Sequence, residues 1–241
     1  MSKLDIIIPV YNEGTGIRNV IDDAAAKIST PHNLLIVYDF EEDTTLPVVR
    51  QYESKFHNLK LIKNKYGLGY INAIKTGLEA AQAEVMVIVT SDSADDLSII
   101  DQMYERIDAG YDIVCGSRYM RGGGQEGGSL LKKMLSRLAG VSLYYLVGFP
   151  THDVTNSFKM YSKKALQEIS IESTGGFELS IEIIVKAFAR GAKITEVPYT
   201  WRDRNIGNSK FKLWKWLPKY LYWYWFALRN RLACPLSRVS L

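Results

Sequence analysis

Several features that define other protein classes are scarce in this sequence. Its 241 residues include only two cysteines, Cys115 and Cys234, which lie far apart and outside any Cys-x-x-Cys pattern. A disulfide framework and a zinc site are therefore not expected, and Cys115, inside an apolar segment, is expected to fill the core. The three histidines share no spacing and have no nucleophile nearby, so the sequence offers no histidine-carboxylate dyad.

Two further absences narrow the function. The first residues run directly into an apolar segment, without the long apolar region and small-residue cleavage site of a signal peptide, so we expect a cytoplasmic protein. No Gly-x-Gly-x-x-Gly follows the first apolar segment, which argues against a dinucleotide-binding dehydrogenase. Gly67 and Gly69 come after the third such segment and lack that spacing.

Positive charge is concentrated near the end of the chain. The net charge is +4, yet between Arg202 and Arg238 nine basic residues face a single acid, Asp203. This asymmetry predicts an anionic partner near this end. We do not expect nucleic acid to be that partner.

Short apolar runs alternate with helical patterns along the first part of the chain. The runs at 4–10, 34–37, 59–62 and 85–89 are typical of buried parallel strands, and residues 17–28, 46–56 and 70–81 have helical spacing. This order predicts an α/β fold with a mostly parallel, Rossmann-like sheet flanked by helices. Ligands of such sheets lie beyond the carboxyl ends of the strands, where Tyr11-Asn12-Glu13, Asp39 and Ser91-Asp92-Ser93 are found.

Two segments later in the chain have distinctive compositions. The glycines between Gly122 and Gly128 predict a mobile loop rather than a regular element, and we interpret it as an active-site lid. Residues 130–149 are expected to form a helix that is too interrupted to span a membrane.

The tail from Leu213 to Phe226 combines four of the five tryptophans with tyrosines and lysines. This mixture suits the headgroup region of a membrane, so we expect residues 213–241 to form an amphipathic helix and tail lying in the membrane interface, after a domain at 1–212. A helix that covers the core, or an oligomer contact, is the alternative. A transmembrane span is least expected, because Pro218 and the lysines interrupt the apolar run.

A series of motifs occurs in the order known from one enzyme family. They are Ile8-Pro9-Val10-Tyr11-Asn12-Glu13, Ile36-Val37-Tyr38-Asp39, Gly67-Leu68-Gly69, Ser91-Asp92, Gly116-Ser117-Arg118-Tyr119, residues 153–159, and Glu196-Val197-Pro198 followed by Arg204 and Gly207-Asn208-Ser209-Lys210. Together they resemble the family 2 inverting glycosyltransferases of GT-A fold, and within them the dolichol-phosphate or polyprenyl-phosphate sugar synthases. The resemblance extends to about residue 212.

By this resemblance, one set of residues binds a nucleotide-diphosphate sugar linked to GDP or UDP. It comprises Pro9, Tyr11, Glu13, Asp39, Asp92, Arg204 and Lys210. For Tyr11-Asn12-Glu13 the alternative is a plain strand-to-helix cap. For Arg204 and Lys210 the alternative is a general basic patch attracted to membranes.

Asp92 occupies the position of the family's DxD metal motif, which implies Mg²⁺ or Mn²⁺ as the cofactor. The motif is degenerate, because Thr90 replaces its first carboxylate and Ala94 follows Asp92 where another ligand is expected. Asp95 or Asp96 could substitute, although both also suit the start of a helix. A turn-capping role is the alternative for Asp92.

The resemblance also implies an acceptor-phosphate site made by Arg118, Lys132 and Ser136, with Asp92, Arg118 and Asp153 as catalytic residues. Lys132 and Lys159 stand where the family commonly has arginine, and lysine lacks the bidentate fork. Asn156-Ser157 likewise replaces the usual Ser-Gly. For Lys132 and its neighbours, a solvated basic helix face is the alternative.

The function implied is transfer of a hexose, of the mannose or glucose class, to a polyprenyl or dolichyl phosphate at the cytoplasmic face of a membrane. A phosphate acceptor is already ionised at neutral pH, so no strong general base is required. A glycan-elongating transferase, or a silent nucleotide-sugar-binding scaffold, is the alternative. A membrane-protein partner or a second copy of the chain is a further expectation.

Overall fold

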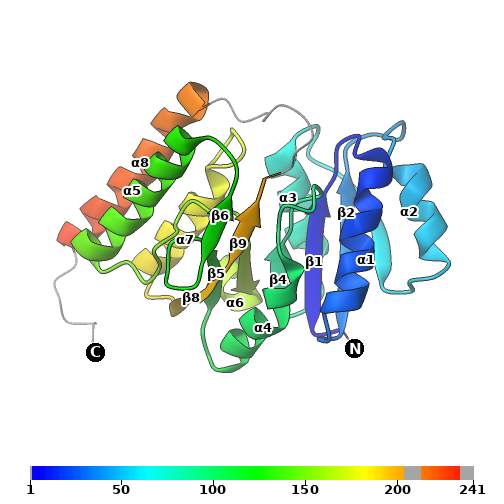
Figure 1. Cartoon of the computed structure of the whole chain (residues 1–241), viewed down its shortest axis with the longest axis horizontal. Helices are drawn as coiled ribbons and strands as arrows, with labels where there is room; N and C mark the ends of the chain where they lie inside the picture. The colour runs from blue at the N-terminus through cyan, green and yellow to red at the C-terminus, as the bar shows by residue number, and fades with distance from the viewer. Residues whose placement is uncertain (1, 204–212, 234–241) are drawn as a thin grey trace.

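The computed structural model describes residues 2–203 and 213–233, with the side chains of 216–230 described in the last helix. The fold is a mixed sheet with helices on both faces (Figure 1). Its seven strands have the order β3-β2-β1-β4-β7-β5-β8. Their bounds are β1 (Leu4–Pro9), β2 (His32–Tyr38), β3 (Leu59–Lys63), β4 (Val85–Ile88), β5 (Ile113–Ser117), β7 (Lys159–Ser162) and β8 (Ile194–Pro198).

The pairing confirms the α/β fold expected from the alternating pattern. Strands β1 to β4 pair in parallel, as do β5 and β8, whereas β7 runs antiparallel to both β4 and β5. The parallel strands are largely apolar because helices cover both faces of the sheet. All six residues of β1 are buried.

Helices divide between the two faces of the sheet. Their bounds are α1 (Ile17–Lys27), α2 (Leu46–Glu53), α3 (Tyr70–Ala80), α4 (Ile100–Asp108), α5 (Leu130–Val147), α6 (Lys163–Gln167), α7 (Leu179–Ala189) and α8 (Leu213–Ala233), with 3₁₀ turns at Gly14–Gly16 and Leu97–Ile99. Alternate residues of β1 face opposite sides: Ile6 and Ile8 pack with α1, α2 and α4, and Ile7 packs with α3. Two layers of core therefore enclose the sheet.

The glycine-rich segment after β5 contains a regular element, contrary to the irregular loop expected from its composition. It contains a strand, β6 (Gly124–Glu126), which pairs in parallel with β9 (Thr200–Arg202) in a small second sheet. Gly123 lies so close to the preceding turn that an added Cβ would be 2.3 Å from the Ser117 carbonyl oxygen, and Gly122 has a φ of 89°. The glycines therefore allow a tight turn and a close backbone approach. The prediction of a segment without a regular element was wrong, and its role as an active-site lid stays a prediction.

Helix α8 lies beside α5 and α7 at one end of the sheet (Figure 1). Its Trp223 and Ala227 are buried in the core, and the Tyr224 hydroxyl lies 2.8 Å from the hydroxyl of Ser142 on α5. Lys186 of α7 places its ammonium 4.8 Å from the centre of the Trp223 ring. The helix expected at this position is confirmed, and one of its faces covers the core. No helix in the described part of the chain is both long enough and apolar enough to cross a membrane.

Candidate functional site

Polar segments gather where β1, β2 and β4 end, as expected for a parallel sheet. The first of these, Tyr11-Asn12-Glu13, follows β1 and bends through Asn12, whose φ is 55°. Asp43 is buried and accepts hydrogen bonds from the amides of Asn12 (3.0 Å) and Thr45 (2.8 Å). The Thr45 hydroxyl accepts a third bond, from the amide of Glu13 (3.0 Å).

Sequence reasoning did not find these three hydrogen bonds, although Asp43 followed by two threonines is a typical local turn signal. They fix the backbone that carries two of the expected site residues. The Tyr11 ring is exposed and packs edge-on against Phe40, with ring centres 5.6 Å apart. Pro9 is buried as the last residue of β1. Tyr11 and Glu13 are thus held at the strand edge by a hydrogen-bonded loop, which Pro9 directly precedes at the end of β1.

Asp39, after β2, is tied to the glycine turn that precedes α3. Its carboxylate accepts hydrogen bonds from the Asn64 side chain (2.7 Å) and the Gly69 amide (2.9 Å). Gly67 and Gly69 both have positive φ, at 84° and 122°, which other residues rarely adopt. The structure therefore brings Asp39 and the Gly67-Leu68-Gly69 motif together. A carboxylate has about four acceptor positions, so these bonds still allow Asp39 to accept from a ligand.

The acids after β4 differ in burial and in hydrogen-bond partners. Asp95 is buried, and it accepts bonds from the amide and hydroxyl of Thr90 (2.8 and 2.9 Å) and from the Tyr199 hydroxyl (2.7 Å). Burial raises the pKa of Asp95 despite these hydrogen bonds. Asp96 accepts from the Ser98 amide at the start of a 3₁₀ turn. Both acids are therefore engaged in holding the loop.

Asp92 is the remaining carboxylate of the degenerate metal motif. It is half-buried, and its Oδ1 accepts a bond from the Ala94 amide at 3.2 Å. Within residues 2–203 and 213–233, no group of three histidine, cysteine or acidic side chains is placed to hold a metal. A hard cation prefers oxygen ligands. Asp92 is thus the residue that would hold a divalent cation here, and the cation would supply charge neutralisation for a bound diphosphate.

Tyr70, at the start of α3, joins this region to the second half of the chain. Its ring is tilted against Phe177, with centres 5.3 Å apart, and its hydroxyl interacts with Ser157. Burial, and then the nearby charges of Asp95 and Asp92, raise the pKa of Tyr70. Sequence reasoning missed this residue, because a tyrosine at a helix start has no signal that distinguishes it from core.

Arg118 and Asp153 form a buried bidentate ion pair. The Arg118 Nε lies 2.6 Å from Asp153 Oδ2 and its Nη2 lies 2.9 Å from Oδ1, while the Arg118 amide also donates to Oδ2. The side chains are 12% and 0% exposed. Burial by itself raises the pKa of Asp153, but the Arg118 charge and hydrogen bonds outweigh it and hold that pKa below its ordinary value. Asp153 therefore orients Arg118.

Helix α5 brings Ser136 close to Tyr119, the residue that follows Arg118. The Tyr119 hydroxyl, one residue after Arg118, makes a short hydrogen bond with the Ser136 hydroxyl. Lys132 is four residues before Ser136 and thus on the same face of the helix. The Lys133 ammonium donates to the Gln125 carbonyl of β6 at 3.3 Å. The three expected acceptor-phosphate residues, Arg118, Lys132 and Ser136, are thus connected through Tyr119 and one helix face.

Lys159, which stands where the family commonly has arginine, is fully buried in β7. Its ammonium donates to the carbonyls of Val154 (3.2 Å) and Asn156, and Asn156 donates from its side chain to the Gly116 carbonyl at 2.7 Å. Burial lowers the pKa of Lys159. Both departures from the family pattern therefore fix the loop that carries Asp153.

The prediction for Cys115 is confirmed. Cys115 is buried, and burial raises the pKa of its thiol to about 12, as suits a core residue. Glu178, which was not among the expected site residues, accepts bonds from the amides of Gly175 and Gly176 and lies 3.5 Å from the Lys219 ammonium of α8. Arg204 and Lys210 lie outside the described residues.

Comparison with known sequences decides the family. Residues 5–170, more than half of the chain, match glycosyl transferase family 2. The chain belongs to this family. It is 28% identical over 217 residues to the dolichol-phosphate mannosyltransferase of Pyrococcus furiosus and 26% identical over 212 residues to the polyprenol monophosphomannose synthase of Mycolicibacterium smegmatis.

These alignments cover 87% and 85% of this family 2 chain. They cover 59% of the Pyrococcus protein and 79% of the mycobacterial one. The resemblance inferred from the motifs is confirmed.

Solved structures support the fold. The glucosyl-3-phosphoglycerate synthase of Mycobacterium tuberculosis, in complex with Mn²⁺, UDP and glucosyl-3-phosphoglycerate, aligns with a TM-score of 0.66. The alignment covers 100% of this chain and 83% of that one, at 17% identity. The same synthase has also been solved with Mg²⁺ and UDP. At this identity the likeness concerns the fold, and it confirms the expected GT-A architecture.

Proposed function

We propose that this family 2 protein transfers a hexose from a nucleotide-diphosphate sugar to a polyprenyl or dolichyl phosphate, with inversion at the anomeric carbon. The observation that carries the proposal is the buried Arg118–Asp153 pair joined through Tyr119 to Ser136 on α5. A fixed guanidinium with a hydroxyl nearby, and a lysine on the same helix face as that hydroxyl, suits a phosphate. The names of the two relatives, which specify dolichol phosphate and polyprenol monophosphomannose, support this acceptor.

The donor would lie over the carboxyl ends of β1, β2 and β4. Pro9, Tyr11, Glu13 and Asp39 are proposed to contact the nucleoside, with Asp39 accepting from N–H groups of the base. Arg204 and Lys210 are proposed to neutralise the diphosphate of the donor, which is a GDP- or UDP-linked sugar. A rigid loop at this edge favours binding because little conformational entropy is lost.

Tyr199 links the donor side to the acceptor side. Its amide donates to the Ser117 carbonyl at 3.1 Å, next to Arg118, and its hydroxyl donates to Asp95 at 2.7 Å, in the loop that carries Asp92. Tyr199 therefore fixes the distance between the two halves of the proposed site. Fixed spacing supports catalysis by positioning, which lowers the barrier when both reactants are held in line.

The chemistry requires the protein to position an anionic acceptor and to tolerate the charge of the departing diphosphate. The acceptor phosphate oxygen attacks the anomeric carbon, and the bond from that carbon to the nucleoside diphosphate breaks. Arg118 and Lys132 would hold the acceptor, and Asp153 would keep Arg118 in place. Mg²⁺ or Mn²⁺ bound beside Asp92 would supply charge neutralisation of the diphosphate.

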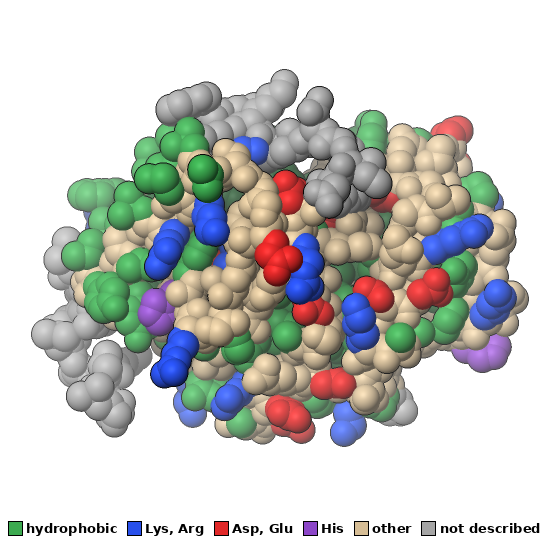
Figure 2. Space-filling model, in the orientation of Figure 1, with side chains coloured by type: hydrophobic (Ala, Val, Ile, Leu, Met, Phe, Trp, Pro, Cys, Tyr) green, Lys and Arg blue, Asp and Glu red, His purple; other side chains and the backbone are tan. Residues whose placement is uncertain are grey.

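We also propose that the enzyme works at a membrane surface on the cytoplasmic side. The support is an apolar ridge formed by exposed side chains of α5 and α8, which Figure 2 shows as green groups with blue cations beside them. The ridge comprises Leu130, Leu131, Met134, Leu138, Tyr145, Leu146, Leu221, Tyr222 and Trp225, all at least 49% exposed. A surface of this kind, flanked by Lys132, Lys133 and Arg137, suits an anionic lipid interface.

The deciding experiment measures transfer of labelled sugar from a panel of GDP- and UDP-sugars to polyprenyl phosphate in the presence of Mg²⁺ or Mn²⁺. We expect a lipid-extractable product with one donor, and a loss of at least about 100-fold with Asp92→Ala. Asp96→Asn, which alters a neighbouring acid that caps a turn, should retain most activity.

Other outcomes would contradict the proposal. Nucleotide binding without transfer from any donor would favour a silent scaffold, consistent with the single carboxylate at the metal motif. Transfer to a glycan but not to the lipid phosphate would favour a glycan-elongating enzyme.

A further inference from the structure

Glu196 of β8 was not among the expected site residues, yet its carboxylate holds the turn that precedes Asp153. Its Oε2 accepts bonds from the Thr151 hydroxyl and the His152 amide, both at 2.8 Å, and its Oε1 lies 2.5 Å from His152 Nδ1. The Glu196 side chain is 11% exposed. Three donors from two consecutive residues therefore converge on one carboxylate in a largely dry environment, where hydrogen bonds are strongest.

The turn passes this constraint to the Arg118 ion pair. The Thr151 hydroxyl, held by Glu196, accepts a bond from the Asp153 amide at 3.1 Å. Asp153 in turn binds Arg118 through both oxygens. A continuous chain of hydrogen bonds therefore runs from Glu196 through Thr151 and Asp153 to the guanidinium.

Helix α5 rests on the same turn from the other side. The Tyr144 ring stacks on the His152 ring, with centres 3.8 Å apart and planes 22° from parallel. At Gly140 the helix lies so close that an added Cβ would be 1.9 Å from the His152 carbonyl oxygen. The helix that carries Lys132 and Ser136 is thus packed directly against the turn that Glu196 fixes.

We propose that Glu196 is a positioning residue of the acceptor-phosphate site. It sets the Thr151–Asp153 turn, and through that turn it places both the Arg118 guanidinium and helix α5. The inference rests on the proposed function, because it assigns Glu196 to the acceptor side of that reaction. Among the described residues, none of these contacts involves the loops after β1, β2 and β4, so we expect Glu196 to act on the acceptor and not on the donor.

The test compares Glu196→Gln with Glu196→Asp and with Glu105→Gln, a matched change on the exposed part of α4. Glu196→Gln removes the negative charge that strengthens all three hydrogen bonds and replaces one of the two carboxylate oxygens by an N–H₂ group, so the turn loses part of its support. We expect the KM for polyprenyl phosphate to rise about tenfold or more, since hydrogen bonds to a charged group are lost. The KM for the sugar donor should stay within about twofold.

Two more variants separate the contributions to the turn. Glu196→Asp keeps the charge and should restore part of the acceptor KM. His152→Ala, which leaves the bonds from Thr151 and from the backbone, should have a smaller effect than Glu196→Gln. Glu105→Gln should change neither KM. Equal effects of Glu196→Gln on both substrates, or no effect on either, would overturn the proposal.

A second measurement does not depend on the reaction. The Arg118 amide donates to Asp153 at 3.2 Å, so its hydrogen exchange reports the position of Asp153. We expect Glu196→Gln to speed exchange at residues 118 and 152–153 without affecting β1 or β2. Unchanged exchange there would refute the positioning role, whereas absence of transfer by the unaltered protein would refute only the proposed function.

Discussion

The Arg118–Asp153 pair is a buried ion pair at the proposed acceptor site. Both charges are removed from water, which costs several kcal/mol for each ion. Their bidentate contact, and the bond from Arg118 to the Thr155 hydroxyl at 3.1 Å, offset that cost. A buried pair of this kind contributes little net stability when intact and much instability when broken. Its retention therefore agrees with a role in holding Arg118 for an anionic ligand.

Asp153→Asn should lower the free energy of unfolding by about 3–5 kcal/mol near neutral pH, because Arg118 loses its countercharge in a buried site. The folded-state pKa of Asp153 lies below the ordinary value of an aspartate, which the unfolded chain regains. The carboxylate therefore contributes its stability above that ordinary value and loses it as the pH falls through the folded-state pKa. The difference in free energy of unfolding between the variant and the unaltered protein should therefore narrow at acid pH. Denaturant unfolding across a pH series measures it.

Asp23→Asn is the matched control for that series. Asp23 forms an exposed pair with Lys27 at 2.9 Å, with side chains about 40% exposed. Exposed pairs of this kind are worth less than about 1 kcal/mol. A gap for Asp153→Asn as small as that for Asp23→Asn, or one that does not change with pH, would show that the buried pair has no such energetic role.

At the scale of elements, close backbone approaches decide where helices sit. Helix α3 meets the sheet at Gly77, where an added Cβ would lie 2.4 Å from Ile7 Cγ2 and 3.2 Å from Val37 Cγ2. Both side chains belong to buried strands. This approach also sets the position of the start of α3, where the Gly69 amide donates to Asp39. A small residue in the helix thus positions part of the proposed donor site.

Gly77→Ala should destabilise the protein by about 1–3 kcal/mol, because the new methyl group overpacks a core that cannot yield. Thermal or denaturant unfolding measures the effect. Gly16→Ala provides the control: no atom lies within 4 Å of its added Cβ, and its φ of −60° suits alanine. That variant should be neutral or slightly stabilising. If Gly77→Ala were equally neutral, the close approach of α3 would have no energetic consequence.

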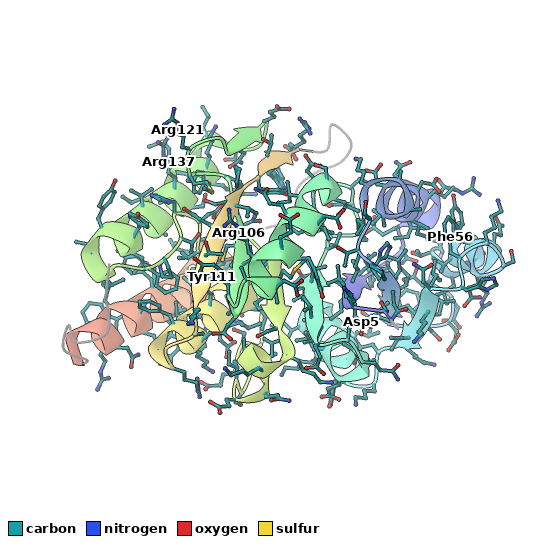
Figure 3. All side chains as sticks on the ribbon, turned by 90° about the horizontal axis from the view of Figure 1, so that it is seen from below. Asp5, Phe56, Arg106, Tyr111, Arg121 and Arg137 are labelled. Carbon is teal, nitrogen blue, oxygen red and sulfur yellow. The ribbon has the colours of Figure 1, made fainter. Side chains whose placement is uncertain are left out.

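At the scale of the whole molecule, α5 and α8 form one surface although they are far apart in sequence. Their inner faces meet through Ser142 and Tyr224, and their outer faces carry the apolar ridge. Figure 3, seen from below, places Arg121 and Arg137 near one another at this end of the molecule, with Asp5 and Phe56 toward the other. The molecule thus has an apolar and basic end next to the proposed acceptor site.

Leu138→Ser combined with Trp225→Ser should weaken binding to vesicles of anionic phospholipid by about tenfold or more, because apolar area buried in the interface is lost. Co-sedimentation with the vesicles measures this. Both side chains are about two-thirds exposed, so the stability of the fold should change little. Leu68→Ser, at an equally exposed site outside the ridge, should leave binding unchanged. Equal loss from both sets of changes would contradict a specific membrane-binding surface.

The sequence predicted the sheet because the information was local. Apolar runs such as those at 4–10 and 85–89 can only be buried in a sheet covered on both faces, and their alternation with helices predicted parallel pairing. The same reasoning placed Asp39 and Asp92 at the carboxyl edge. The reasoning failed for the glycine-rich segment, because composition does not distinguish glycines needed for a close backbone approach from glycines that confer mobility.

By itself, therefore, the sequence determined the fold class, the family, and the edge of the sheet where the polar segments gather. Only the tertiary structure decided which acid is buried, as with Asp95, which bonds to Tyr199. It also decided which distant residues converge, as with Glu196 and the turn at His152. The physical reason is that apolar periodicity acts within one element. The partner of a buried polar group, in contrast, is set by contacts between elements separated by 40 or more residues.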